Sequence, residues 1–130
     1  MLGEAPAAPT GPRLRFTQAQ RLERPWEFER VRREGQRVVK GCLILNWRAA
    51  GEEQGISRLG VVTSRKIGNA VVRSRARRLL REVFRRHQHE FAQPLDIVMV
   101  ARQSIVANEY AEVERDFEAA ARQGRIMRKL

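Results

Sequence analysis

Residues 65–86 form an amphipathic pattern whose polar side is almost entirely basic. The segment contains nine Lys and Arg residues and a single acid, Glu82, which gives it a net charge of +8. With about 100° of rotation per residue, its apolar residues share one side of a helix: Val72, Ala76, Leu79, Leu80 and Val83. Arginines take the opposite side: Arg77, Arg78, Arg81 and Arg85. We therefore expect a helix that docks its apolar stripe on a core and holds its cations outward.

The charge of this segment stands out against the rest of the chain. The whole sequence carries +11, and the other 108 residues, with 17 basic and 14 acidic side chains, account for only +3. Exposed helix faces usually mix the two signs in i,i+4 pairs, whereas this one has one acid. The imbalance favours a polyanion partner, nucleic acid above all. Because the Val, Ala and Leu stripe is needed for the core, an anionic membrane surface or a calmodulin-type partner is disfavoured.

Apolar periodicity and the positions of Pro and Gly predict the elements around the basic helix. In chain order these are a helix over about 25–34, β-like residues 38–47, a loop over 49–55, a strand over 56–64, the basic helix over about 69–89, a strand over 95–101, and a last helix that Asn108 caps and Gly124 ends. The order predicts an α/β (α+β) two-layer sandwich, in which a small mixed sheet of about four strands packs with about three helices.

A length of 130 residues corresponds to one domain. We expect a flexible Ala/Pro-rich tail over 1–12, one folded domain over 13–125 and a short tail over 126–130. Cys42 is the only cysteine, so the sequence predicts neither a disulfide framework nor a cysteine-based zinc site. With no apolar run of transmembrane length and no signal-peptide pattern at its start, the chain is expected in the reducing cytoplasm.

The sequence contains no set of side chains typical of catalysis. Neither a Ser/His/Asp arrangement nor a phosphate-binding loop motif is present. A stand-alone nuclease would need acids near the basic helix, where only Glu82 lies. His87 and His89 are two residues apart and do not share a helix face, and no further His or Cys completes a metal site. The acids of the last helix suit its dipole. We therefore predict no catalytic residue and no metal ligand in this chain, although the acids of the last helix leave a carboxylate metal site open.

The run from Ser64 to Glu82, Ser-Arg-Lys-Ile-Gly-Asn-Ala-Val-Val-Arg-Ser-Arg-Ala-Arg-Arg-Leu-Leu-Arg-Glu, closely resembles the signature of the bacterial ribonuclease P protein subunit family. That family has a lysine-rich turn, then Gly-x-Ala-Val, an Arg-Asn-Arg-type motif and a basic helix that ends in Arg-Glu. Arg58–Val62 and Leu95–Arg102 resemble its flanking strands, and Phe28 with Val31 resembles its first helix. The resemblance covers residues 13–125. A structural RNA binder, such as a ribosomal protein or an RNA chaperone, would share the composition but not this signature.

The resemblance implies a protein cofactor of a ribozyme. In the family, the RNA subunit carries out Mg²⁺-dependent hydrolysis that removes the 5′ leader of precursor tRNA. The protein binds the RNA subunit and the leader, and supplies no catalytic side chain or cofactor of its own. The implied partners are therefore the ribonuclease P RNA and precursor tRNA, with no protein partner and no membrane. The family fold also implies a left-handed crossover between strands around the basic helix.

Carried over residue by residue, the resemblance implies an RNA-binding set and a leader cleft. The RNA-binding set is Arg65, Lys66, Asn69, Arg73, Ser74, Arg75, Arg77, Arg78, Arg81 and Arg85. The cleft positions are Phe28, Arg32 and Asn46. Ser74 stands where the family has Asn, Arg32 where many members have an aromatic residue, and Asn46 where Tyr is frequent. We therefore expect a cleft that is less aromatic and more cationic than is usual in the family.

Overall fold

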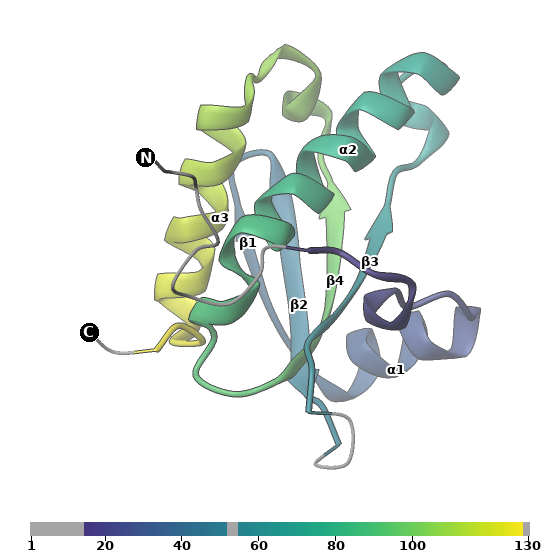
Figure 1. Ribbon diagram of the computed structural model, residues 1–130. Helices are drawn as coiled ribbons and strands as arrows, with labels where there is room; N and C mark the ends of the chain where they lie inside the picture. Colours follow the sequence, from purple (N-terminus) through teal and green to yellow (C-terminus); the bar gives the residue numbers. More distant parts are fainter. Residues whose placement is uncertain (1–14, 52–54, 129–130) are drawn as a thin grey trace, which may run out of the picture.

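The computed structural model describes residues 15–51 and 55–128, and its three helices and four strands confirm the predicted fold class (Figure 1). The predicted tail over 1–12 lies outside the described residues. The helices are α1 (Pro25–Glu34), α2 (Ala70–His87) and α3 (Tyr110–Gly124), and the strands are β1 (Gln36–Lys40), β2 (Leu43–Ala49), β3 (Arg58–Val62) and β4 (Leu95–Ala101).

The sheet is mixed and has the strand order β1-β2-β4-β3. β2 is antiparallel to both β1 and β4, whereas β3 is parallel to β4. The β-like stretch 38–47, predicted as one segment, is in fact a hairpin that turns at Gly41 and Cys42. Gly41 has a φ of +54°, a backbone conformation that residues other than glycine adopt only with strain. That single glycine divides the stretch into β1 and β2.

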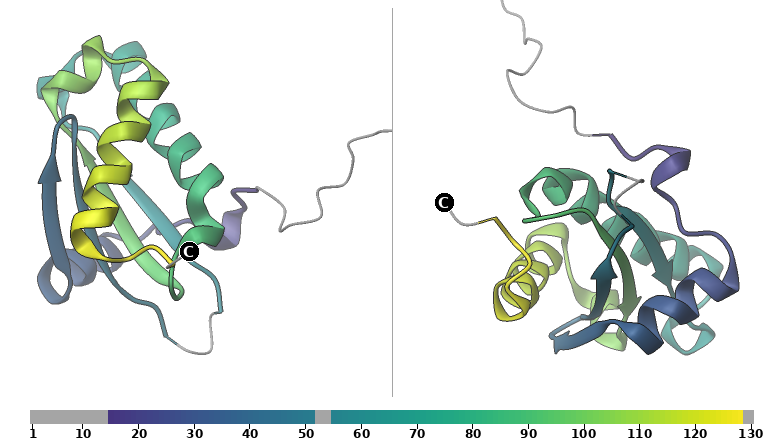
Figure 2. Two further views of the ribbon diagram at one scale, coloured as in Figure 1. Left: turned by 90° about the vertical axis from the view of Figure 1, so that its left-hand side faces the viewer. Right: turned by 90° about the horizontal axis from the view of Figure 1, so that it is seen from below.

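Helices cover both faces of this sheet (Figure 2). α2 packs on β3 and β4, α3 packs on β1 and β2, and α1 packs against β2 and β4 from the opposite face. The side chains of β4 alternate accordingly: Ile97 and Met99 belong to the main core under α2 and α3, and Val98 belongs to the smaller core under α1. The sandwich predicted with two layers therefore has a third, which α1 forms.

The connection from β3 through α2 to β4 is left-handed. In Figure 1 both strands run upward behind α2, and β4 lies to the left of β3. Nearly all parallel β-helix-β connections are right-handed, so composition and periodicity could not have predicted this arrangement. It agrees with the crossover that the family resemblance implies.

Local hydrogen bonds set the helix ends. Asn69 caps α2, because its side-chain oxygen accepts a hydrogen bond from the amide of Val72 at 3.0 Å. The cap predicted for α3 at Asn108 is wrong by one residue: Glu109 is the cap, and it forms a capping box with Glu112. Asn108 instead ends the preceding 3-10 helix, where its amide donates to the carbonyl of Ile105.

Part of the segment beyond residue 125 packs on the domain. Ile126 is buried in the main core, and its carbonyl accepts a hydrogen bond from the amide of Ala92 at 2.8 Å. Met127 forms an isolated β-bridge with Phe91. In the described part of the chain, no helix has the length and apolar character that crossing a membrane requires.

Candidate nucleic-acid interface

The apolar stripe of α2 is buried against the sheet and α3, as its pattern predicts. Ala76, Leu80 and Val83 are buried, and so is Phe84, which extends the stripe toward the C-terminal end of the helix. Val72 and Leu79 are partly buried at its margin. The packing fixes the rotation of α2 about its axis, so its arginines are held at the surface on a rigid element.

Most cations of the predicted RNA-binding set have no acidic partner among the described residues. In residues 15–51 and 55–128, no carboxylate lies within ion-pair distance of six of them: Arg65, Lys66, Arg73, Arg77, Arg78 and Arg81. Arg75 differs, because it lies 3.7 Å from the carboxylate of Glu109. This surface therefore keeps most of its positive charge available for an external anion.

Several of these arginines are held in place by neutral groups. Arg73 donates to the carbonyl of Gly68 at 2.8 Å, and Arg75 donates to the carbonyl of Asn108 at 2.7 Å. Arg77 donates to the hydroxyls of Thr63 at 2.8 Å and Ser74 at 3.1 Å. These bonds orient the guanidinium groups without neutralising them, which lowers the entropy lost when they bind a phosphate.

Glu82 neutralises the C-terminal part of the basic surface. Its two carboxylate oxygens accept hydrogen bonds from Arg85 at 2.9 and 2.7 Å, and a further bond comes from Arg86 at 2.8 Å. The hydrogen bond from Arg85 is the main cause that lowers the pKa of Glu82 to about 2. Arg85 was predicted to face RNA, and in this structure it is paired with an acid.

Arg21, which precedes α1 in the chain, lies close to two arginines of α2, Arg77 and Arg81. Burial lowers the pKa of Arg81, and the positive charges of Arg21 and Arg77 lower it further. The guanidinium of Arg21 also lies over the ring of Phe16, 4.7 Å from its centroid. Mutual repulsion in this cluster is relieved when an anion binds between the guanidinium groups.

Two adjoining hollows flank this cluster. The first, of about 420 Å³, is lined by Phe16, Ser74, Arg77, Arg78, Arg81, Glu82 and Arg85. The second, of about 270 Å³, is lined by Phe16, Arg21, Leu22, Glu23, Phe28, Leu59, Gly60, Val61 and Arg81. Phe16 and Arg81 line both, so the two hollows are neighbours between the basic side of α2 and the ring of Phe28. Phe16, Arg21 and Gly60 were not predicted as site residues.

The three predicted cleft residues do not share one site. Phe28 lines the second hollow and lies against the backbone of Gly60. Asn46 is only 3% exposed, and its side-chain amide donates to the carbonyl of Val98 at 3.2 Å. Arg32 is exposed on α1. Neither Arg32 nor Asn46 lines the hollow that contains Phe28.

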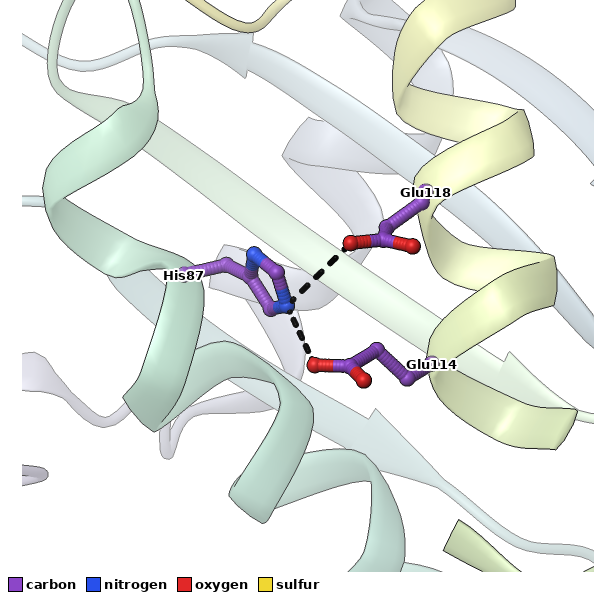
Figure 3. Close-up of side chains that lie close together, drawn as sticks. All are labelled: His87, Glu114 and Glu118. Carbon is purple, nitrogen blue, oxygen red and sulfur yellow. Dashed lines mark hydrogen bonds and ion pairs between the residues drawn. The ribbon is translucent and has the colours of Figure 1, made fainter. Parts of the chain in front are cut away.

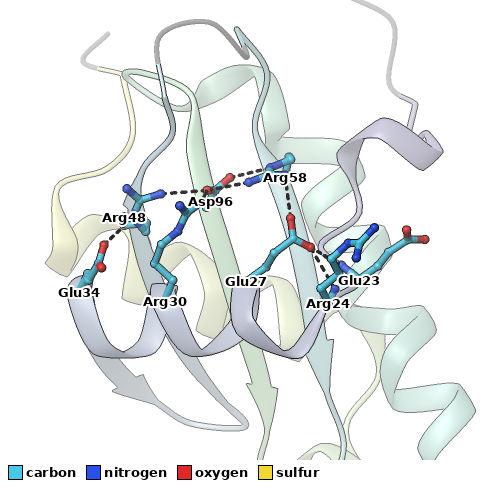
Figure 4. A network of polar contacts seen from close by, with 8 residues as sticks. All are labelled: Glu23, Arg24, Glu27, Arg30, Glu34, Arg48, Arg58 and Asp96. Carbon is cyan, nitrogen blue, oxygen red and sulfur yellow. Dashed lines mark hydrogen bonds and ion pairs between the residues drawn. The ribbon is translucent and has the colours of Figure 1, made fainter.

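A separate polar network ties α1 to the sheet, on the face opposite to α2 (Figure 4). Its centre is Asp96, which accepts hydrogen bonds from Arg58 at 2.9 and 3.0 Å and from Arg48 at 3.2 Å. Arg58 also donates to Glu27 of α1 at 3.1 Å. This network fixes the first turns of α1, and therefore Phe28, relative to β3 and β4.

Comparison with known proteins adds an independent finding. The family model described as ribonuclease P matches residues 16–124. The ribonuclease P protein component of Roseiflexus castenholzii is 40% identical over 89 residues, which cover 68% of this chain and 71% of that protein. The RNase P protein structure from Staphylococcus aureus, at 25% identity, has a TM-score of 0.76 and covers 85% of this chain and 100% of that one. For the Thermotoga maritima protein the identity is 27%, the TM-score 0.69 and the coverages 78% and 96%. With its basic helix, its mixed sheet and these matches, the chain belongs to the ribonuclease P protein family.

Proposed function

We propose that the cationic side of α2 binds the RNA subunit of ribonuclease P and that the two adjoining hollows receive the 5′ leader of precursor tRNA. As a ribonuclease P protein component, the chain partners that RNA and binds precursor tRNA in the holoenzyme, whose tRNA-processing activity is carried by the RNA. The observation that supports the proposed site most is the cluster of Arg21, Arg77 and Arg81, which has no acidic partner among the described residues.

In this proposal the RNA contacts are electrostatic and depend on the rigid helix. The RNA-facing set is Arg65, Lys66, Asn69, Arg73, Ser74, Arg75, Arg77, Arg78, Arg81 and Arg85. Each phosphate that one of these cations neutralises releases condensed counterions, so affinity falls as the salt concentration rises. Arginine suits this role because its planar guanidinium can donate two parallel hydrogen bonds to one phosphate.

The leader contacts would be of two kinds in these neighbouring hollows. Arg21, Arg77 and Arg81 would hold a backbone phosphate at the junction of the two hollows. The ring of Phe28 would stack on an unpaired base, a contact worth about 1–3 kcal/mol that does not require a particular base. Arg32 and Asn46 contribute less in this proposal, because one lies outside the hollow and the other is buried.

The proposal also assigns the metal requirement to the RNA. Mg²⁺ would act in the RNA-catalysed hydrolysis, and the protein would lower the Mg²⁺ concentration that the holoenzyme needs by neutralising phosphates. We further propose that the holoenzyme acts in the cytoplasm, a reducing compartment in which the free thiol of Cys42 is stable.

A cleavage assay tests the function directly. The full-length chain is mixed with the ribonuclease P RNA of the same organism and a precursor tRNA at low Mg²⁺, and release of the 5′ leader is measured. We expect the chain to stimulate cleavage by the RNA. No stimulation would contradict the proposal, and cleavage without the RNA would indicate a stand-alone nuclease.

A substitution in α1 tests the leader path. Phe28→Ala should weaken holoenzyme binding of precursor tRNA more than binding of mature tRNA, because only the precursor has a leader. Trp26→Ala is the matched control: Trp26 is an exposed aromatic residue of the same helix, and it does not line the hollow. Equal losses for the two tRNAs in Phe28→Ala would remove Phe28 from the leader site.

A further inference from the structure

The C-terminal end of α2 and the middle of α3 bring together one histidine and two glutamates (Figure 3). Nε2 of His87 lies 2.8 Å from Oε2 of Glu114 and 3.9 Å from Oε2 of Glu118. One ligand atom from each of the three residues can be chosen so that all lie within 4.8 Å of one another. The side chain of His87 is only 8% exposed, so its ring is fixed between the helices.

The other nitrogen of the His87 ring also faces a carboxylate. Nδ1 lies 3.0 Å from Oε1 of Glu90. A neutral imidazole has one N–H, and in the tautomer that donates from Nδ1 to Glu90, Nε2 carries no proton. The lone pair of Nε2 then points toward Glu114 and Glu118. Carboxylates at both ring nitrogens favour a positive charge at this site, which either a second proton on His87 or a metal ion at Nε2 supplies.

The three groups match the donor set of a transition-metal site. Zn²⁺ binds imidazole nitrogen and carboxylate oxygen at about 2.0–2.2 Å, so neighbouring ligands of a tetrahedral ion lie about 3.3–3.5 Å apart. The separations from Nε2 of His87, 2.8 Å and 3.9 Å, bracket that value. Glu114 and Glu118 are one helical turn apart on α3, so they face α2 together. Tyr110 donates to Oε2 of Glu114 at 3.1 Å and orients that carboxylate.

We propose that His87, Glu114 and Glu118 bind one Zn²⁺ ion, with Glu90 positioning the His87 ring through Nδ1. A carboxylate hydrogen-bonded to the distal ring nitrogen is the arrangement typical of metal-bound histidines. The ion would connect the end of α2 to α3 and leave a fourth position for water. Mg²⁺ fits this site poorly, because it prefers an all-oxygen octahedron, so the site is distinct from the Mg²⁺ requirement of the RNA.

Zn²⁺ binding by the metal-free, full-length chain tests the proposal without RNA. Titration with Zn²⁺ near neutral pH should show one saturable site and an increase in the unfolding temperature, and millimolar Mg²⁺ should not compete. Glu90→Gln should lower the Zn²⁺ affinity by about 10–100-fold, the loss typical of a residue that orients a metal-bound histidine. His87→Gln and Glu118→Gln, which remove direct ligands, should lower it by at least as much.

His89→Gln is the matched control, because it removes the chain's other histidine and leaves the cluster intact. It should bind Zn²⁺ as the wild type does. If His87→Gln fails to fold, Glu118→Gln decides, since Glu118 is partly exposed and its contact with His87 is long. Three results would each overturn the proposal. They are the absence of saturable Zn²⁺ binding in the wild type, an unchanged Zn²⁺ affinity in Glu118→Gln, and a loss of Zn²⁺ affinity in His89→Gln as large as that in His87→Gln.

Discussion

Asp96 is a buried carboxylate that interacts with three arginines. Its carboxylate is 1% exposed and accepts hydrogen bonds from Arg58 and Arg48, while Arg30 lies 4.0 Å away. A buried charge of this kind is tolerable only when its partners remain in place. The arginines depend on Asp96 in the same way, because removing the carboxylate leaves them partly buried beside one another.

We predict that Asp96→Asn lowers the free energy of unfolding by about 3–5 kcal/mol, the cost typical of breaking a buried ion pair on one side. Urea unfolding of the free protein measures this loss. Glu34→Gln is the control: it removes an exposed partner 3.6 Å from Arg48 and should cost less than about 1 kcal/mol. A loss below about 1 kcal/mol for Asp96→Asn would show that the network orients α1 without stabilising the fold.

Gly60 controls the position of the Phe28 ring, because a Cβ atom at residue 60 would overlap that ring. We predict that Gly60→Ala displaces Phe28 and reproduces the selective loss of precursor tRNA binding expected for Phe28→Ala. In the double variant the two effects should not add, since both act on the same contact. Equilibrium binding of precursor and mature tRNA to the four holoenzymes measures this. Additive losses would mean that Gly60 and Phe28 act at separate places.

At the scale of the element, α2 combines predictable and unpredictable features. Its stripe and its basic side follow from residue spacing alone, and the structure confirms the stripe. The N-cap at Asn69 was not predicted, because the helix was expected to include that residue. The pairing of Glu82 with Arg85 and Arg86 was not predicted, although their spacing allows it. The hairpin turn at Gly41 was missed because Val38–Trp47 is apolar almost throughout, and one glycine in it does not distinguish a turn from a bulge.

The pairing of Glu82 makes the stability of α2 dependent on pH. The pKa of Glu82 is about 2 in the folded protein, below the ordinary 4.5, so the native state binds this proton less tightly than the unfolded chain does. The stabilisation is therefore complete above pH 4.5 and disappears as the pH falls to about 2. We predict that wild type and Glu82→Gln differ in unfolding free energy near pH 6 and converge near pH 2. A constant difference across this range would contradict the assignment.

At the scale of the whole molecule, the candidate site is assembled from segments far apart in sequence. Phe16 and Arg21 precede α1, yet they lie beside Arg81 because Leu22 donates a backbone hydrogen bond to Leu59 at the edge of β3. Nothing in the local sequence of residues 16–22 indicates this pairing. The metal candidate has the same origin: His87 and His89 suggested no site, and the carboxylates that face His87 come mainly from α3. Periodicity predicts elements, whereas contacts between elements depend on the topology.

The same topology concentrates positive charge on one side of α2. Variants that remove equal charge from α2 and from α3 can therefore test whether RNA binding depends on the position of the charge or on its total amount. Two double variants each remove two charges and lower the net charge from +11 to +9: Arg77→Ala/Arg81→Ala on α2 and Arg115→Ala/Arg122→Ala on α3. Arg115 and Arg122 are exposed on α3, outside both hollows. Binding to the ribonuclease P RNA is described by the slope of log K against log salt concentration. Each lost phosphate contact should reduce the magnitude of this slope by about 0.7–0.9.

We predict this flattening for the α2 pair and an unchanged slope for the α3 pair, as measured by equilibrium binding across a series of salt concentrations. Equal changes in the two variants would mean that the RNA responds to the total charge of the protein. A change confined to the α2 pair would mean that the burial of its apolar stripe, by fixing where the guanidinium groups point, determines where the RNA binds.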